Sequence, residues 1–358
     1  MPVLTRLVPS PLVVDIRAGA LQDLGAVLAD QRLSANGRIA VAASAGSGAR
    51  LRERLSPQLP GADWYTVPDG TLDAAVTLAD QIKKGGSYDA LIGLGGGKII
   101  DVAKYAAARV GLPVVAAATN LAHDGLCSPV STLDNDAGRG SYGVPSPIGI
   151  VIDLDVIREA PDRFVASGIG DVLSNISACA DWELSHRETG EPVDGLAVAM
   201  ARSAGETLLR HPGTIKEDGL LVALAEALVL SGISMNITGS TRPSSGACHE
   251  MSHALDLLYP ERSREHGEQC GFGAAFASFL RGEREVAGQI ATTLHRHGLP
   301  VTAAQLGFSA EEFAEAVQYA PQTRPGRFTI LEHLDLDPHA IRDAYSDYVK
   351  DITAGLAG

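Results

Sequence analysis

The stretch DALIGLGGGKIIDVAKYAA, residues 89–107, decides the fold of this chain. Its first half is a short apolar run, as in a buried strand, and its second half repeats apolar residues three and four apart, as in a helix. Glycines at 93 and 95–97 lie between the two halves. A strand that passes into a helix through bare backbone is typical of a parallel α/β sheet, and the free N–H groups at such a helix start favour a phosphate.

This junction matches neither common nucleotide motif. Lys98 stands where G-x-G-x-x-G requires its last glycine, and Ile99 stands where a Walker motif requires Ser or Thr. Two interpretations therefore stay open at this point. The glycines either let a pyrophosphate approach the backbone, or they supply the positive φ angles of a tight turn.

The same alternation extends through the first part of the chain. β-rich runs occur at 12–16, 38–44, 64–67, 89–95, 112–118 and 148–154, mostly with helical spacing between them. We predict an α/β domain with a Rossmann-like parallel sheet over residues 1–160, with a loop or hairpin at 134–147. After residue 160 only helical patterns remain, which predicts an all-helical domain over residues 161–358.

Composition excludes several classes of protein. The formal charge of −14 opposes binding to a nucleic-acid backbone. No apolar run reaches the roughly 20 residues of a membrane helix, and no basic flank leads into an apolar segment at the start. The four cysteines are widely spaced and form no C-x-x-C pair. We predict a cytoplasmic protein with no membrane or nucleic-acid partner.

Polar side chains follow the run at 112–118, in the segment TNLAHDGLCS. Thr119, His123, Asp124 and Ser128 lie there, after a predicted parallel strand. Ligands of open α/β sheets bind at the carboxyl ends of the strands, so these side chains are candidates for ligand contacts. The alternative is that H-D-G serves only as a turn.

Three of the ten histidines cluster late in the chain, at His249, His253 and His266. The first two form H-E-x-x-H with Glu250, the zinc-protease pattern in which both histidines bind the metal and the glutamate acts as base. The longer protease pattern is absent, because Asp256 and Tyr259 occupy its Gly and third His positions. Asp171, taken alone, is predicted to be a helix cap or first-turn charge.

Five motifs, in order, resemble one known superfamily. They are LGGGKIIDVAK, TNLAHDGLCSP, GIGDVLSN with ADWEL, SSGACHEMSHALD and HGEQ. Together they are similar to the iron-type alcohol dehydrogenase, glycerol dehydrogenase and dehydroquinate synthase superfamily, and most similar to its sn-glycerol-1-phosphate dehydrogenases. The resemblance covers roughly residues 10–285 and implies a dehydroquinate synthase-like fold.

The resemblance also implies a metal site. Asp171, His249 and His266 match the family's ligands to one divalent ion, for which we expect Zn²⁺ first, with Fe or Ni as alternatives. His253 would then face the substrate and carry a proton. Glu250 would point away from the metal.

The implied cofactor is NAD or NADP. Its site would comprise Gly95, Gly96, Gly97, Lys98, Asp101, Thr119 and Ser128. Asp124 matches a catalytic position close to the substrate hydroxyls, with His123 beside it. Ser44 ends the second strand where an acidic residue would favour NAD, so NADP stays open.

We therefore predict a metal-dependent, NAD(P)-dependent dehydrogenase that interconverts dihydroxyacetone phosphate and sn-glycerol 1-phosphate, or a related polyol phosphate, and forms a homo-oligomer. Arg242 is the candidate phosphate contact; the alternative is a solvated surface arginine. Other candidate functions are a glycerol- or cyclitol-type dehydrogenase of specialised metabolism, a cyclising lyase like dehydroquinate synthase, and a zinc protease. Asn120, Leu121 and Cys248 depart from the family's pattern, which leaves the substrate open.

Overall fold

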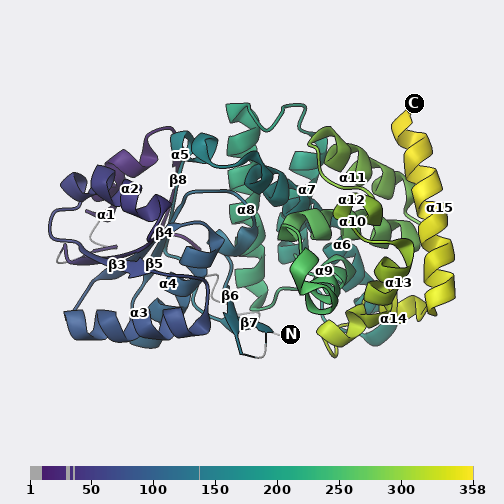
Figure 1. Cartoon of the computed structure of the whole chain (residues 1–358), viewed down its shortest axis with the longest axis horizontal. Coiled ribbons are helices and arrows are strands. Elements are labelled where there is room, and N and C mark those ends of the chain that lie inside the picture. The colour runs from purple at the N-terminus through teal and green to yellow at the C-terminus, as the bar shows by residue number, and fades with distance from the viewer. Residues whose placement is uncertain (1–9, 30–32, 35–36, 137, 358) are drawn as a thin grey trace, which may run out of the picture. The chain divides into compact units, whose positions relative to one another are not determined.

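The computed structural model describes residues 10–29, 33–34, 37–136 and 138–357. The chain divides into two compact units, Met1–Pro161 and Asp162–Gly358. The first is built on a sheet and the second is helical, as Figure 1 shows. Both classes of structure were predicted, and the predicted fold class is confirmed.

The sheet unit contains six parallel strands in the order β1-β8-β5-β4-β2-β3. Their bounds are β1 Val13–Arg17, β2 Ile39–Ser44, β3 Asp63–Val67, β4 Ala90–Gly95, β5 Val114–Ala118 and β8 Gly149–Asp153. Each coincides with a predicted run. The central strands β4, β5 and β8 are buried along their whole length, which explains why the runs read as continuously apolar rather than alternating.

Helices cover both faces of this sheet. They are α1 Leu24–Leu28, α2 Ser47–Leu55, α3 Leu72–Gly85, α4 Gly97–Val110 and α5 Leu154–Glu159, with 3-10 turns η1 Ala20–Asp23, η2 Ser56–Gln58 and η3 Asp124–Leu126. One apolar cluster joins α1 and α2 to one face, through side chains such as Val41 and Ile92. A second joins α3 and α4 to the other face, through Ala42 and Leu91. Neighbouring residues of a strand thus serve opposite cores.

A hairpin extends from the sheet unit, as predicted. Its strands are β6 Val130–Asn135 and β7 Gly138–Gly143, paired antiparallel. It begins four residues before the predicted segment, because residues 130–133 pair with the returning strand. Tyr142 of the hairpin meets Tyr105 of α4 edge to face, with ring centroids 5.3 Å apart.

The second unit is helical throughout the part that the structure describes. Its helices are α6 Asp162–Thr189, α7 Gly195–Arg210, α8 Asp218–Thr238, α9 Ala247–Leu258, α10 His266–Leu280, α11 Arg284–Arg296, α12 Ala303–Leu306, α13 Ala310–Tyr319, α14 Ile330–Leu334 and α15 Pro338–Ala357, with turns η4 Pro260–Arg262 and η5 Ala320–Thr323. The long helix α6 contacts α7, α8, α9 and α10. It is therefore the centre of this unit.

Among the described residues, α8 is the one helix that is long and apolar enough to cross a membrane by length and composition. However, 72% of its apolar window is buried inside the unit, and the helix packs on α7 and α6. A core helix shows the same apolar composition on all sides. Its burial therefore accounts for its hydropathy.

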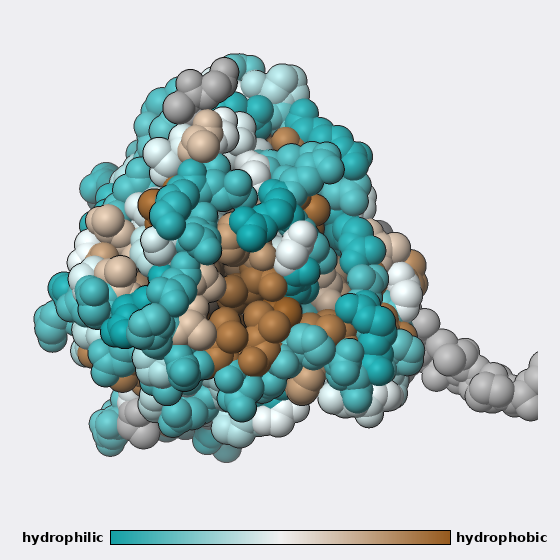
Figure 2. Space-filling model, turned by 90° about the vertical axis from the view of Figure 1, so that its right-hand side faces the viewer, coloured by the Kyte–Doolittle hydropathy of each residue, from teal (hydrophilic) through white to brown (hydrophobic). Residues whose placement is uncertain are grey.

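A pocket of about 100 Å³ with a largely apolar lining lies among α10, α13, α14 and α15. Its lining includes Phe276, Val317, Ile330, Leu334 and Ile341. Figure 2 views the molecule from the side of α15 and shows apolar side chains gathered in a hollow that polar side chains surround. The only titratable side chain lining this pocket is Asp335, so catalysis is not expected there.

Candidate metal and nucleotide sites

Glycines bring α6 and α10 unusually close together. A Cβ atom on Gly170 would lie 2.1 Å from the carbonyl oxygen of Gly267, and one on Gly267 would lie 1.7 Å from that of Ser167. Neither position has room for any side chain. Because the two backbones touch, Asp171 of α6 and His266, the first residue of α10, face a common point.

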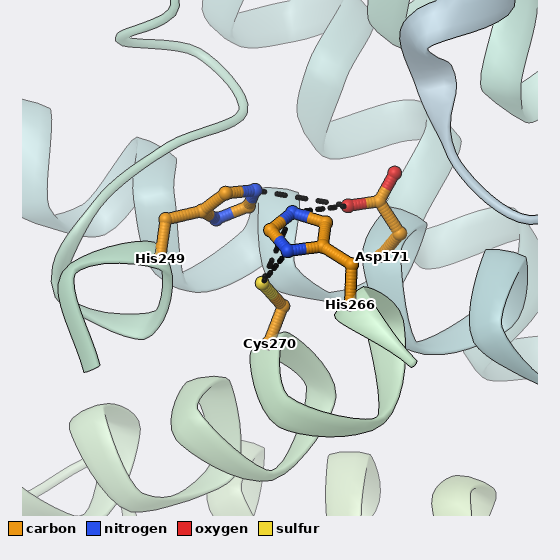
Figure 3. A group of neighbouring side chains, drawn as sticks. All are labelled: Asp171, His249, His266 and Cys270. Atoms are coloured by element: carbon orange, nitrogen blue, oxygen red, sulfur yellow. Dashed lines mark hydrogen bonds and ion pairs between the residues drawn. The ribbon is translucent and has the colours of Figure 1, made fainter. Parts of the chain in front are cut away.

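Four potential metal ligands meet there, as Figure 3 shows. Asp171 Oδ1 lies 3.7 Å from His249 Nε2 and 3.9 Å from His266 Nε2. Cys270 Sγ lies 3.4 Å from His266 Nε2. All four ligand atoms lie within 4.8 Å of one another. The structure thus brings together the three residues predicted as ligands and adds a cysteine that the sequence reasoning missed.

The environment of this cluster suits imidazole ligands. Burial, followed by the nearby His266 and His253, holds the pKa of His249 well below its ordinary value, so the ring is neutral at pH 7. Ser252 Oγ lies 3.3 Å from His266 Nδ1 and accepts a 2.9 Å hydrogen bond from Gln269 Nε2. A hydrogen-bonding group at the ring nitrogen that does not bind the metal orients a ligand histidine. Ser252 is placed to do this for His266.

The chemistry of this donor set fits a divalent transition metal. Two imidazole nitrogens and a carboxylate oxygen are the ligands of many catalytic zinc sites. Asp171 has only 3% of its side chain exposed, and it lies in the middle of α6 beside the rings of His249 and His266. A buried carboxylate of this kind is favourable when a cation shares its site.

Two alternatives for these residues are wrong. Asp171 is neither a cap nor a first-turn charge, because α6 begins nine residues earlier, at Asp162. The protease arrangement also fails among the described residues. His253 is not part of the ligand group, and Glu250 Oε2 instead accepts a 3.2 Å hydrogen bond from Thr329. Burial raises the pKa of Glu250 to about 9, so it is a poor base.

His253 has an arginine beside it that the sequence reasoning missed. Arg324 Nη2 donates to His253 Nε2 over 3.1 Å. The direction is certain, because a guanidinium has no acceptor atom. Arg324 lies 71 residues beyond His253, past the span of the recognised motifs, and no local pattern connects the two.

Arg242, the predicted phosphate contact, has another partner. It is 5% exposed, which rules out the surface arginine. Its Nε donates to Glu191 Oε1 over 2.8 Å, and its Nη2 donates to Ser185 over 3.1 Å and also pairs with Glu191. Arg327 nearby donates to Thr241 Oγ1 over 2.9 Å and to the carbonyl of Ser245. Of these three arginines, only Arg324 has no oxygen partner among the described residues.

In the sheet unit, β4 ends at Gly95 and α4 begins at Gly97. None of the glycines at 93 and 95–97 has positive φ, so the tight-turn interpretation is wrong. They allow neighbouring side chains to approach the backbone closely instead. A Cβ on Gly96 would lie 2.4 Å from Asn120 Nδ2, and one on Gly97 would lie 2.0 Å from His123 Nε2. The first turn of α4 is therefore bare backbone next to the segment that follows β5.

That segment is held against the glycines by hydrogen bonds. Thr119 N donates to Gly95 O over 3.0 Å. Gly125 N donates to His123 Nδ1 over 3.0 Å, at the start of η3. His123 and Asp124 are partly exposed, whereas Lys98 is exposed on α4. Thr119, His123 and Asp124 thus lie at the carboxyl end of β5, close to the glycine junction.

Asp101 and Ser128, both predicted to contact the nucleotide, belong to a buried network around Lys104. Lys104 Nζ lies 3.0 Å from Asp101 Oδ1 and 3.4 Å from Ser128 Oγ, and donates to Gly125 O over 2.7 Å. Its side chain is fully buried. This lysine, which the sequence reasoning missed, links α4 to the segment that follows β5. In the structure Asp101 and Ser128 contact Lys104, so they help to hold that segment in place.

Comparisons with known proteins agree with this arrangement. Residues 15–161 match the sequence family described as iron-containing alcohol dehydrogenase. The chain is 40% identical to a glycerol-1-phosphate dehydrogenase (NAD(P)+) of Methanospirillum hungatei, over 74% of this chain and 73% of that protein. It is 34% identical to the enzyme of the same name from Methanothermobacter thermautotrophicus, over 91% and 93%.

Among solved structures, glycerol dehydrogenase from Schizosaccharomyces pombe superposes with a TM-score of 0.79 at 23% identity, over 99% of this chain and 92% of that one. At that identity the likeness concerns the fold alone. It covers both units.

Proposed function

Because the chain belongs to the iron-containing alcohol dehydrogenase family, in its glycerol-1-phosphate dehydrogenase branch, we propose that it interconverts dihydroxyacetone phosphate and sn-glycerol 1-phosphate. In the reductive direction one ketone, one NAD(P)H and one proton yield one secondary alcohol and NAD(P)+. The observation that carries this proposal is the convergence of Asp171, His249 and His266, from three helices, on one point.

The three residues would hold one divalent cation, for which Zn²⁺ is our first candidate. When bound, the cation supplies Lewis-acid polarisation of the substrate carbonyl and the reduced nicotinamide supplies hydride. His249 and His266 would each present a ring nitrogen to the cation, and Asp171 would offset part of its positive charge. His253 delivers the proton that the new hydroxyl requires, either directly or through water.

We assign the substrate phosphate to Arg324 rather than Arg242. The guanidinium of Arg242 is already occupied by Glu191, so a phosphate would have to displace a buried carboxylate. Arg324 is partly exposed and bonds only to His253 among the described residues. A guanidinium without an anion recognises phosphate by paired hydrogen bonds. Its contact with His253 places that cation next to the proton carrier.

For the nucleotide, the proposal depends on the start of α4. The first N–H groups of an α-helix have no partner within the helix. In α4 those of Ile99 and Ile100 donate to Gly96 O, which leaves those of Gly97 and Lys98 for a ligand. A pyrophosphate is attracted there by the helix dipole and by Lys98. Ser44 accepts a 3.1 Å hydrogen bond from Gly48 N and carries no charge, so we propose that NADP is accepted as well as NAD.

Cytoplasmic location, a homo-oligomer and the lack of nucleic-acid and membrane partners remain predictions. The negative charge supports the lack of a nucleic-acid partner, and the absence of disulfides supports a cytoplasmic location. All four cysteines are buried, and none of them forms a disulfide.

The direct test is reduction of dihydroxyacetone phosphate by the zinc-loaded enzyme, followed by nicotinamide absorbance with NADH and NADPH in parallel. We expect oxidation of the nucleotide, formation of the 1-phosphate enantiomer, and a lower rate with unphosphorylated dihydroxyacetone. Consumption of neither nucleotide with any phosphorylated ketone would reject the proposal.

The phosphate assignment has its own test. Arg324→Ala should raise the KM for dihydroxyacetone phosphate about tenfold to hundredfold, the effect of losing one charge-assisted contact of about 1.5–3 kcal/mol. The KM for dihydroxyacetone should not change, and Arg324→Lys should recover part of the loss. Equal effects on both ketones would rule out a phosphate contact.

A further inference from the structure

Asp181, in the recognised motif ADWEL, belongs to neither the metal cluster nor the nucleotide junction. It lies on α6, further along that helix than Asp171, and its side chain is fully buried. Burying a carboxylate is costly unless its oxygens are hydrogen-bonded and its charge is compensated. The partners of Asp181 therefore indicate what it does.

The first partner is the start of the helix that carries His249. Asp181 Oδ2 accepts a 2.8 Å hydrogen bond from the backbone N–H of Ala247, the first residue of α9. The cap residue of this helix is Gly246, which has no side chain to accept such a bond. A carboxylate from α6 thus takes the place of a capping side chain, and its charge suits the positive end of the helix dipole. His249 lies in the same first turn, since its N–H donates to Gly246 O over 3.0 Å.

Gly246 makes this contact possible. A Cβ there would lie 2.4 Å from Asp181 Oδ2 and 3.0 Å from Ala178 Cα. The φ angle of Gly246 is −125°, so glycine is not required for a left-handed conformation. It is required because any side chain would push the carboxylate away from α9.

The second partner is the end of the segment that carries Arg324, between η5 and α14. Asp181 Oδ1 accepts a 3.1 Å hydrogen bond from the N–H of Ile330, the first residue of α14. The same segment is tied to α9 directly, because Thr329 Oγ1 donates to Glu250 Oε2 over 3.2 Å. One carboxylate therefore holds the first residue of α9 and the first residue of α14.

Arg281 supplies the compensating charge. Its Nη1 donates to Asp181 Oδ1 over 2.7 Å, and its Nη2 donates to Ser177 and Ser278 over 3.0 and 3.1 Å. The arginine side chain is 5% exposed. The ion pair is thus fixed inside the helical unit, and the carboxylate holds both helix starts without leaving an uncompensated buried charge.

We propose that Asp181 is a positioning residue that fixes the metal ligand His249 and the cationic Arg324 relative to each other. It contacts neither the metal ligands nor the substrate, and acts through the first residues of α9 and α14. The spacing that it sets decides which ketones reach the metal with their carbonyl and Arg324 with their phosphate. This inference rests on the metal and phosphate roles in the proposed function.

Asp181→Asn in the full-length protein tests this role. An amide has one oxygen, so its NH₂ group must face either the N–H of Ala247 or the donors of Ile330 and Arg281. Zinc affinity, measured by competition with a chelating dye, should fall about tenfold, as for other groups that orient ligands. At saturating zinc the KM for dihydroxyacetone phosphate should rise about tenfold, less than the roughly hundredfold cost of a 1 Å misplacement. The KM for dihydroxyacetone should stay like that of wild type.

Asp153→Asn is the matched control. Asp153 is also fully buried and accepts hydrogen bonds from the N–H groups of Gly19 and Leu21, over 3.0 and 3.1 Å, but it lies in the sheet unit. This variant should bind zinc like wild type, and denaturant unfolding compares its stability with that of Asp181→Asn. Gly246→Ala displaces the carboxylate without removing its charge, so it should weaken zinc binding as Asp181→Asn does.

Wild-type zinc affinity in both Asp181→Asn and Gly246→Ala would overturn the inference, and so would an equal loss in Asp153→Asn. Equal changes in the KM for both ketones would show that Asp181 does not position Arg324. If wild-type protein binds zinc but reduces no phosphorylated ketone, the proposed function fails, whereas the zinc affinities still decide whether Asp181 positions His249.

Discussion

The two candidate sites of this protein are built in opposite ways. The nucleotide site at the β4–α4 junction consists of exposed backbone, and its glycines matter because they carry no side chains. The metal site in the helical unit consists of side chains, and its helices α6, α9 and α10 matter because they bring those side chains to one point. Glycines serve both sites: in the first they allow close contact with the segment that follows β5, and in the second they allow close contact between helices.

This difference predicts different sensitivities. Adding atoms should damage the backbone site, through steric conflict with His123 and Asn120. Removing donor atoms should damage the side-chain site, because it depends on charge and coordination. A variant of one site is therefore expected to leave the other site unchanged.

The largest effect is expected at the ligands. His249→Ala should lower kcat/KM at least about a thousandfold, because Lewis-acid stabilisation contributes several kcal/mol and each 1.4 kcal/mol is a factor of ten. Steady-state kinetics and metal content measure this loss. Nucleotide affinity, followed by NADPH fluorescence, should stay within about twofold of wild type. Wild-type activity in this variant would remove His249 from the site.

At the glycine junction, Gly97→Ala should raise the KM for nucleotide roughly tenfold to hundredfold, matching an overpacking cost of about 1–3 kcal/mol. The cause is the 2.0 Å approach of the new Cβ to His123. Gly46→Ala is the matched control, since Gly46 starts α2 after β2 with negative φ and no atom within 4 Å of a new Cβ. Equal effects of the two substitutions would refute the steric account.

Orientation of the ligand histidine should matter less than the histidine itself. Ser252→Ala removes the hydroxyl beside His266 Nδ1 and should weaken metal binding about tenfold to hundredfold, as for other groups that orient ligands. Competition with a chelating dye gives the affinity. Ser234→Ala, which alters a buried serine of α8 bonded to Ser231 O, should bind metal like wild type. Unchanged affinity in the Ser252 variant would show that His266 is oriented by other contacts.

The smallest effect concerns acid stability. Nine of the ten histidines lie in the helical unit, and His123 alone lies in the sheet unit. Burial, followed by Arg296 and His211, lowers the pKa of His297 to about 4. The folded state therefore resists protonation of this ring, whereas the unfolded state is protonated below pH 6.5. The stabilisation is complete above pH 6.5 and is lost as the pH falls toward 4.

His297→Gln should reduce that loss by roughly 1–2 kcal/mol, measured by denaturant unfolding between pH 4 and pH 7. His295→Gln, near the end of α11 and two residues before His297, is the control, because His295 is exposed. A pH dependence that is identical in all three proteins would show that His297 is not the group responsible.

The nucleotide site and the metal site also differ in how well the sequence predicted them. The six strands were predicted because a parallel sheet covered on both faces produces short apolar runs that are adjacent in sequence to their turns. The glycine junction was found for the same reason, although its interpretation as a tight turn with positive φ was wrong. Strands and strand–helix junctions can be predicted because the residues that form them are contiguous in sequence.

The metal site was only partly predictable. The spacing of His249 and His253 suggested two ligands from one helix, and only the resemblance to a family pointed to Asp171, His249 and His266. Cys270, Arg324 and Lys104 were missed, because their roles depend on which helix faces meet. Arg242 was nominated from its loop, but its partner Glu191 lies 51 residues away in sequence.

The central claim is tested most directly by anomalous diffraction at the zinc edge from crystals of the zinc-loaded protein. The account predicts one peak within bonding distance of Asp171, His249 and His266, and beyond bonding distance of His253. A peak bonded to both His249 and His253, or no peak between the three residues, would contradict it.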